Sequence, residues 1–243
     1  MTDTIEHTAA RVIVTIDGPA GTGKSSVARD LAAELGLEFL DTGAMYRAAA
    51  LVVIERSLTL EDPTSVAAAV RNAEIHFEWD DDPPTLFAFG EPRSARLRDP
   101  DVSAMVSPVS KLPEVRAVLV EKQRRIGEVH PRLVSEGRDQ GSVVFPDADV
   151  KVFLDASVDV RTRRRVEQLA ALDRPADSEA IRREIVDRDR RDSTRAVGPL
   201  VCPDDAVRVS TDELNQRQVV ERLVEIVADR VDADRLAAAA RVG

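Results

Sequence analysis

The stretch RVIVTIDGPAGTGKSSVARDLAAELG, residues 11–36, decides the fold. Its first part, Arg11–Asp17, is a β-branched apolar run that predicts a buried strand. Gly18–Gly23 interrupts this pattern, and from Lys24 to Leu35 the apolar residues recur at helical spacing. Gly36 is well placed to end the helix. The stretch therefore predicts a strand, a glycine-rich loop and a helix.

The loop GPAGTGKS, Gly18–Ser25, fits the phosphate-binding pattern G-x-x-x-x-G-K-[ST] at every fixed position. Glycines let backbone N–H groups point inward around an anion, and the following helix adds the positive end of its dipole. Lys24 can reach the β- and γ-phosphates, and the Ser25 hydroxyl can ligate Mg²⁺. We therefore expect ATP or GTP with Mg²⁺ to bind here. The residues expected to hold the nucleotide are Gly18, Pro19, Ala20, Gly21, Thr22, Gly23, Lys24, Ser25 and Ser26.

Such a loop occurs in GTPases, motor ATPases and small-molecule kinases. A guanine-specific site usually contains Asn-Lys-x-Asp, but the only two asparagines, Asn72 and Asn215, do not precede lysine. A motor ATPase would usually need a longer chain with further motifs. The pattern therefore favours a small-molecule kinase.

The rest of the chain predicts an α/β protein. Strand Leu37–Leu40 and helix Thr42–Ile54 continue a strand–helix alternation that implies a parallel sheet covered on both faces. Ala73–Trp79 and Leu86–Phe89 read as short antiparallel strands around an acidic, proline-containing turn. The alternation then resumes. The later expected elements are helix Glu114–Glu128, strands Arg132–Ser135 and Val150–Leu154, helices Val158–Leu172 and Ser178–Arg195, strand Ala206–Val209, and a long helix from Asn215 to about Ala240.

Composition limits the possible partners. The formal net charge is −10, which argues against non-specific nucleic-acid binding, and no apolar run is long enough to span a membrane. Residues 1–10 lack the apolar core of a signal peptide, and the single cysteine, Cys202, fits a reducing compartment. We therefore expect a cytoplasmic monomer that acts on a small molecule.

Three further segments carry candidate binding residues. Thr42, Tyr46 and Arg47 span little more than one helical turn and can converge on one acceptor. Arg138 and Asp139 lie between two glycines in a loop that follows a strand, where ligand groups tend to lie. In the last segment, Arg188, Asp192 and Arg195 share one helical face, and Arg191 lies four residues from Arg195. Like charges at this spacing repel, so the last arrangement favours a polyanionic ligand between the arginines. Taken alone, the first segment would also fit a surface-capped helix with an exposed arginine, the second a turn with a local ion pair, and the third a solvated, salt-bridged helix face.

Taken together, these segments resemble the bacterial cytidylate kinase family of the nucleoside monophosphate kinases. The resemblance rests on IDGPAGTGKSS (16–26), LDTGAMYR (40–47), GRDQGSVVFPDADVKVFLDAS (137–157) and RDRRDSTRAVGPL (188–200). It implies a three-layer P-loop fold with a parallel central sheet, a small antiparallel insertion for the acceptor nucleotide and a helical lid. It implies a core at 11–65 and 106–243, an insertion at 66–105 and a lid at about 161–177. The implied reaction transfers the γ-phosphoryl group of ATP to CMP or dCMP.

The resemblance also implies roles for individual residues. Lys24, Arg188, Asp192 and Arg195 match catalytic positions, and Ser25 matches the Mg²⁺ ligand. The implied substrate-binding residues are Thr42, Tyr46, Arg47, Ser107, Arg116, Arg138, Asp139, Arg188, Asp192 and Arg195. Of these, Ser107, Arg116 and Asp139 match the residues that read the cytosine ring.

Some questions stay open at this stage. Asp17, Asp139 and Asp155 all lie near expected strand ends, so each is a candidate second Mg²⁺ ligand. Gln140 stands where the family has an apolar residue and is expected to alter packing around the nucleobase. The alternatives to a cytidylate kinase are a P-loop kinase for another small acceptor, such as UMP, shikimate or gluconate, and a module that senses ATP without turning it over.

Overall fold

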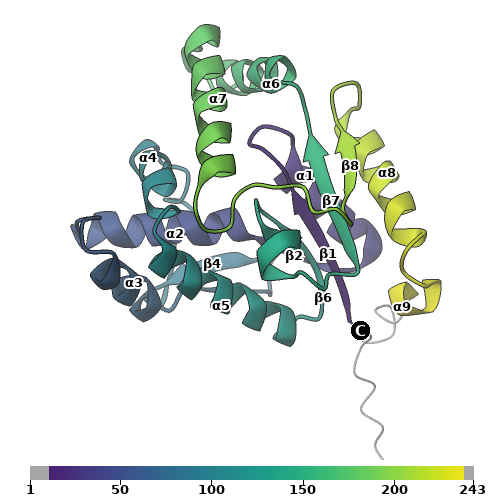
Figure 1. Cartoon of the computed structure of the whole chain (residues 1–243), viewed down its shortest axis with the longest axis horizontal. Coiled ribbons are helices and arrows are strands. Elements are labelled where there is room, and N and C mark those ends of the chain that lie inside the picture. The colour runs from purple at the N-terminus through teal and green to yellow at the C-terminus, as the bar shows by residue number, and fades with distance from the viewer. Residues whose placement is uncertain (1–10, 238–243) are drawn as a thin grey trace, which may run out of the picture.

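The computed structural model describes residues 11–237 and has a five-stranded parallel sheet at its centre (Figure 1). The strands are β1 (Val12–Asp17), β2 (Glu38–Asp41), β6 (Arg132–Glu136), β7 (Val150–Asp155) and β8 (Val207–Ser210). Their order across the sheet is β2-β6-β1-β7-β8, and every neighbouring pair is parallel. The predicted α/β class is confirmed.

Helices cover both faces of this sheet, which gives three layers. The covering helices are α1 (Lys24–Leu35) and α8 (Gln216–Ala228) on one face, and α2 (Thr42–Glu55) and α5 (Pro113–Val129) on the other. Side chains of β1 alternate between the two layers, because successive residues of a strand point to opposite faces. Val12 and Val14 pack with α1 and α8, whereas Ile13 packs with α2 and α5.

The middle of the chain forms the predicted antiparallel insertion. Its elements are α3 (Pro63–Asn72), β3 (His76–Glu78), β4 (Thr85–Ala88), β5 (Glu91–Pro92) and α4 (Pro100–Val109). Leu86 and Leu97 belong to the same apolar cluster as Met45 of α2, so the insertion shares its core with the main sheet. Trp79 makes a second contact between the insertion and the rest of the domain, because its ring stacks on His130 at the end of α5 with 4.2 Å between ring centroids.

Two helices lie beyond the carboxyl edge of the sheet. In Figure 1, α6 (Val158–Ala170) and α7 (Ser178–Thr194) stand above the end of β7. They pack against each other, and the connection between them spans 171–177. Ligands bind at this edge in open α/β sheets, so α7 is placed where its charged face can contribute.

The predicted long C-terminal helix is wrong. The helix α8 ends at Ala228, and a separate short helix, α9 (Ala233–Ala237), follows. Arg132 explains the break, because its guanidinium donates hydrogen bonds to the carbonyl oxygens of Arg235 and Leu236 at 2.7 and 2.8 Å. The chain must turn back to make these bonds. The part of the prediction that covers 238–240 lies outside the described residues.

No helix within residues 11–237 combines the length and the apolar character needed to cross a membrane.

Candidate active site

A cleft at the carboxyl edge of the sheet brings together most of the predicted site residues. The predicted residues that line it are Ala20, Gly21, Gly23, Lys24, Ser25, Ser26, Thr42, Tyr46, Arg47, Arg116, Arg138, Asp139, Arg188, Asp192 and Arg195. They come from five separate segments: three follow or lie at the ends of β1, β2 and β6, which meet at this edge, and the other two are α5 and the C-terminal part of α7 with Arg195 after it. Among the predicted substrate-binding residues, Ser107 is the one that does not line this cleft.

The phosphate loop has the backbone that its glycines predict. Gly18 has a φ of 145°, and a Cβ atom there would lie 2.0 Å from the carbonyl oxygen of Leu154. Lys24 is buried, and its Nζ donates to the Pro19 carbonyl oxygen at 2.7 Å. The pKa of Lys24 is lowered to about 7, chiefly by burial and also by the nearby Arg138 and Arg188, whereas Glu136 acts in the opposite direction. The Lys24 amine therefore contacts the backbone of the loop in which a phosphate is expected to bind.

Glu136 is the functional candidate that sequence reasoning missed. It is the last residue of β6, it is buried, and its Oε1 accepts a 2.7 Å hydrogen bond from the Ser25 hydroxyl. Burial raises the pKa of Glu136, the nearby Asp41 raises it further, and Lys24 lowers it. The available signal was an acidic side chain immediately before Gly137, at the end of a strand next to the phosphate loop.

The three aspartates that were open candidates for Mg²⁺ have other partners. Both carboxylate oxygens of Asp17 accept backbone N–H groups, from Gln140 and Gly141, at 2.8 Å. Burial raises the pKa of Asp17 to about 6 despite these bonds. Asp139 is paired with Arg116, and Asp155 bonds to Arg208 at 2.8 Å, away from the cleft lining. This leaves the Ser25–Glu136 pair as the oxygen-rich position beside the phosphate loop.

The helix α2 contributes three residues to one side of the cleft. The Thr42 hydroxyl donates to the Glu136 carbonyl oxygen at 2.7 Å, and Arg47 forms a 2.7 Å ion pair with Asp41. Tyr46 lies beneath the Arg116 guanidinium, 5.3 Å from the ring centroid. Burial raises the pKa of Tyr46 to about 12, so its phenol stays protonated. Thr42, Tyr46 and Arg47 all line this cleft, and their convergence on one acceptor stays a prediction.

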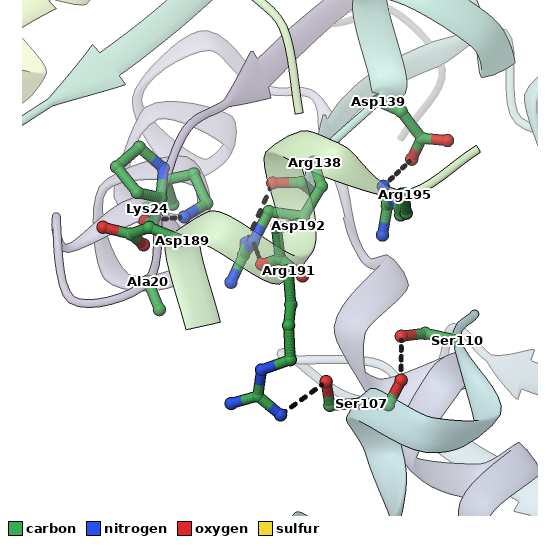
Figure 2. Close-up of polar contacts among 12 residues, drawn as sticks. Ala20, Lys24, Ser107, Ser110, Arg138, Asp139, Asp189, Arg191, Asp192 and Arg195 are labelled. Atoms are coloured by element: carbon green, nitrogen blue, oxygen red, sulfur yellow. Dashed lines mark hydrogen bonds and ion pairs between the residues drawn. The ribbon is translucent and has the colours of Figure 1, made fainter. Parts of the chain in front are cut away.

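A buried ion pair forms the base of the cleft. Arg116 and Asp139 contact each other, and their side chains are only 2% and 3% exposed. Arg195 approaches the second carboxylate oxygen of Asp139 at 3.8 Å, as Figure 2 shows. Arginine and a carboxylate side by side offer both donors and acceptors, which suits recognition of a base edge rather than of a simple anion.

The helix α7 presents its predicted charged face to the cleft. Asp192 accepts a 3.1 Å hydrogen bond from Nε of Arg138 (Figure 2). Arg188 lines the cleft and has no hydrogen bond or ion pair with any of residues 11–237. Burial lowers the pKa of Arg188, as does the neighbouring Arg138. Asp192 and Glu184 act on Arg188 in the opposite direction, but neither forms an ion-pair contact with it. A half-buried guanidinium beside another one, with no carboxylate in contact, is suited to bind a phosphate group.

Arg191 does not join this face. Its guanidinium reaches from α7 to α4 and donates to the Ser107 hydroxyl at 3.1 Å (Figure 2). Ser107 in turn accepts at its carbonyl oxygen from the Ser110 hydroxyl at 3.1 Å. Arg195 instead donates to the Gly198 carbonyl oxygen and approaches Asp139, so the two guanidiniums have separate partners.

Gln140 also differs from its expected position. It is fully buried behind the loop that carries Arg138 and Asp139, and it does not line the cleft. Its amide accepts from the Ser135 hydroxyl at 2.8 Å and donates to Gln123 at 3.1 Å. Gln140 also begins a π-helix, η1 (Gln140–Val144), which is a rare element that is frequent near functional sites. Gln140 thus supports the loop from behind and does not reach the cavity where a nucleobase would lie.

Comparison with known proteins gives a consistent result. A family model described as cytidylate kinase matches residues 14–229. A cytidylate kinase of Nocardia farcinica is 44% identical over 220 residues, which cover 90% of this chain and 95% of the relative. One from Rhodococcus opacus is 45% identical over 219 residues, covering 90% and 96%. A solved structure of an uncharacterised protein from Eubacterium ventriosum is 12% identical with a TM-score of 0.52, covers 90% of this chain and 99% of that one, and supports the fold alone.

Proposed function

The chain belongs to the cytidylate kinase family, and from this premise we propose that its cleft transfers the γ-phosphoryl group of ATP to CMP or dCMP, giving ADP and CDP or dCDP. The family makes the chain an ATP-dependent kinase with a nucleotide substrate. The residues that hold each substrate, Mg²⁺ and the choice between CMP and dCMP are parts of the proposal.

The observation that carries the proposal is the pairing of two anion-binding sets in one cleft. One set consists of the amides of the phosphate loop with Lys24, and the other is the arginine face of α7 with Arg188. A protein that only senses ATP needs the first set alone. An unpaired Arg188 opposite Lys24 supports a second phosphate-bearing ligand, and therefore transfer between two ligands.

The chemistry assigned to the protein is electrostatic. Phosphoryl transfer needs two substrates held in line and positive charge around the transferred group. In the proposal, Lys24 and the loop amides hold the β- and γ-phosphates of ATP, and Arg188 and Arg195 hold phosphate groups from the opposite side. The acceptor oxygen is already an anion at neutral pH, so the reaction needs no strong general base.

The acceptor is proposed to lie on the α2 and α5 side. Arg47 would exchange its ion pair with Asp41 for the acceptor phosphate, and Asp192 would contact the sugar. Arg116 and Asp139 would present a donor and an acceptor to the cytosine edge. What supports these roles is that all four residues line the cleft, and that Arg47 and Arg116 are each paired with a carboxylate, Asp41 and Asp139 respectively.

The Ser25–Glu136 pair has the chemistry that Mg²⁺ prefers, because the ion binds hard oxygen ligands and keeps several waters. We propose that the Ser25 hydroxyl would be a direct ligand of the ion and that the Glu136 carboxylate would help to hold it. Bound Mg²⁺ would supply positive charge that neutralises the phosphates of ATP. Among residues 11–237, no group of three or more acidic, histidine or cysteine side chains is arranged to bind a metal, which fits an ion held mainly by the nucleotide.

An acceptor panel tests the proposed function. Purified protein is given ATP, Mg²⁺ and one of CMP, dCMP, UMP, AMP or shikimate, and ADP release is measured. We expect turnover with CMP and dCMP well above that with UMP or AMP. Turnover with UMP but not CMP would contradict the substrate assignment. Tight ATP binding without acceptor-dependent ADP release would favour the sensing alternative.

A further inference from the structure

Arg161 lies at the start of the segment that the family resemblance designates as a lid, yet it is one of the most buried arginines of the described chain. Its side chain is 4% exposed, although it stands in the first turn of α6. A long charged side chain is rarely buried without partners that require it there. The contacts of Arg161 therefore indicate what the residue does.

Two of these contacts fix Arg161 beneath the phosphate loop. Its Nε donates to the Ala156 carbonyl oxygen at 3.0 Å, and its Nη1 donates to the Ala20 carbonyl oxygen at 3.2 Å. Gly21 lies directly against it, because a Cβ at Gly21 would be 3.3 Å from the Cβ of Arg161. The stem of Arg161 thus packs against the loop that is proposed to hold the ATP phosphates.

The third contact reaches α7. The same Nη1 forms a 2.6 Å ion pair with Oδ2 of Asp189. The other carboxylate oxygen, Oδ1, is buried and has no hydrogen-bond partner within the described residues, so Arg161 is the group that neutralises this carboxylate. One nitrogen therefore joins the phosphate loop to α7.

Because Asp189 is next to Arg188 on α7, its contact with Arg161 also affects where Arg188 lies. Asp189 directly follows Arg188, and successive residues of a helix point about 100° apart. When Asp189 is held against Arg161, Arg188 is turned into the cleft that Lys24 lines. This ion pair, whose arginine is buried, is the contact that ties the rotation and height of α7 to Arg161 and the phosphate loop, in addition to the contacts of α7 with α6 and α4.

We propose that Arg161 is a positioning residue that holds α7, through Asp189, against the phosphate loop, so that binding of ATP and binding of the acceptor favour each other. The inference rests on the proposed function, because it takes the phosphate loop and α7 as the two substrate sides. A ligand that orders the loop orders the Ala20 carbonyl and Arg161, and through Asp189 it orders the arginine face. By thermodynamic linkage, the acceptor must then strengthen the binding of ATP by the same factor.

The test measures coupling between the two ligands. The dissociation constant of CMP is measured by calorimetry with and without a non-hydrolysable ATP analogue, for wild type, Arg161→Met and the control Arg163→Met. Arg163 lies on the same helix, is exposed, and has no ion pair or hydrogen bond within residues 11–237. We expect the analogue to tighten CMP binding about tenfold in wild type and control, and less than about twofold in Arg161→Met.

Turnover gives a second readout, through a double-mutant cycle. We expect Arg161→Met to lower kcat by about 10²-fold, since small misplacements of catalytic groups cost that much. If Arg161 acts by placing Arg188, the pair Arg161→Met with Arg188→Met should lose no more kcat than Arg188→Met alone. Arg161→Lys, which keeps the charge, should recover part of the loss.

Asp189→Asn keeps the inference falsifiable if Arg161→Met does not fold, because the amide keeps the shape of the side chain and should show the same loss of coupling. Equal coupling in wild type and Asp189→Asn, no coupling in wild type, or losses of kcat that multiply in the cycle would each overturn the inference. If the acceptor panel selects UMP, the proposed function fails, and the same coupling is then measured with UMP.

Discussion

The hydroxyl of Ser25 donates a 2.7 Å hydrogen bond to the carboxylate of Glu136, across 111 residues of sequence. The bond joins the phosphate loop at the end of β1 to the loop at the end of β6, because these strands are parallel neighbours in the sheet. A buried carboxylate is thereby placed beside the position proposed for Mg²⁺.

Replacing Glu136 by glutamine should separate activity from stability. The amide keeps an oxygen for the Ser25 hydroxyl but removes a charge whose burial is unfavourable, as the raised pKa of Glu136 indicates. We expect kcat to fall by about 10²-fold while the free energy of unfolding stays unchanged or increases. Steady-state kinetics over a range of Mg²⁺ concentrations and urea unfolding check this. Unchanged kcat at low Mg²⁺ would contradict the role given to Glu136.

Removing Arg116 alone should destabilise the protein more than removing both members of the Arg116–Asp139 pair. Arg116→Met leaves the Asp139 carboxylate buried without its main partner, which typically costs about 3–5 kcal/mol. Adding Asp139→Leu to that variant removes the uncompensated charge and should recover part of the loss. Urea unfolding of the single and double variants measures both effects. A double variant less stable than Arg116→Met would show that the carboxylate has another stabilising partner.

Lys24 should take up a proton when ATP binds. Its pKa of about 7 leaves most of the amine neutral at pH 8, and the phosphates of ATP would raise that pKa. We expect an uptake approaching one proton at about pH 8, and less at about pH 6, where the amine is already charged. Calorimetry in two buffers of different ionisation enthalpy measures the uptake. Lys24→Arg stays charged at both pH values, so it should show no pH-dependent uptake from this position.

Asp17 predicts a specific dependence of stability on pH. Its pKa rises from 3.8 to about 6 on folding, so the folded state binds the proton more tightly than the unfolded state. The resulting stabilisation is fully present below about pH 4 and is lost as the pH rises through about 6, a change of about 3 kcal/mol. Asp17→Asn cannot titrate, so the stability of wild type relative to this variant should increase as the pH falls from about 7 to 4. A constant difference over that range would contradict the raised pKa.

Gln140→Leu should affect stability more than substrate binding. The substitution leaves the Ser135 hydroxyl and the Gln123 carbonyl without partners in the interior, at a cost of about 1–3 kcal/mol. Because Gln140 does not line the cleft, KM for CMP should change by less than about twofold. Thermal unfolding and steady-state kinetics distinguish the two effects. A large change in KM with unchanged stability would place Gln140 at the nucleobase after all.

The sequence was most informative where spacing is local. The strand, loop and helix of residues 11–36 follow from one hydrophobic run and one glycine pattern, and the structure has them with β1 at Val12–Asp17 and α1 at Lys24–Leu35. Helices α3 and α4 were missed, although each begins with Asp-Pro, a pattern typical of a helix start. Each helix buries only two residues, Val66 and Val70 in α3 and Val102 and Val109 in α4, so neither carries a strong helical pattern of core residues.

In the candidate site, residues in short motifs could be predicted from the sequence, but residues whose role depends on distant contacts could not. Its arginines were predicted because phosphate recognition restricts residue types within short motifs. Glu136 was missed because its partner, Ser25, lies 111 residues away, and Gln140 was misplaced because the side of a loop on which a residue lies depends on tertiary contacts. The bond from Arg161 to Ala20 and the break after α8 likewise depend on contacts between distant segments.

The stacking of Trp79 on His130 gives the molecule an intrinsic optical reporter. The chain has one tryptophan, so all of its indole fluorescence comes from the junction where the antiparallel insertion meets the central domain. Emission intensity and quenching then follow that junction alone, without labels and without interference from other indoles. With excitation that is selective for the indole, a change at that junction can be timed in a stopped-flow instrument without a contribution from the single tyrosine.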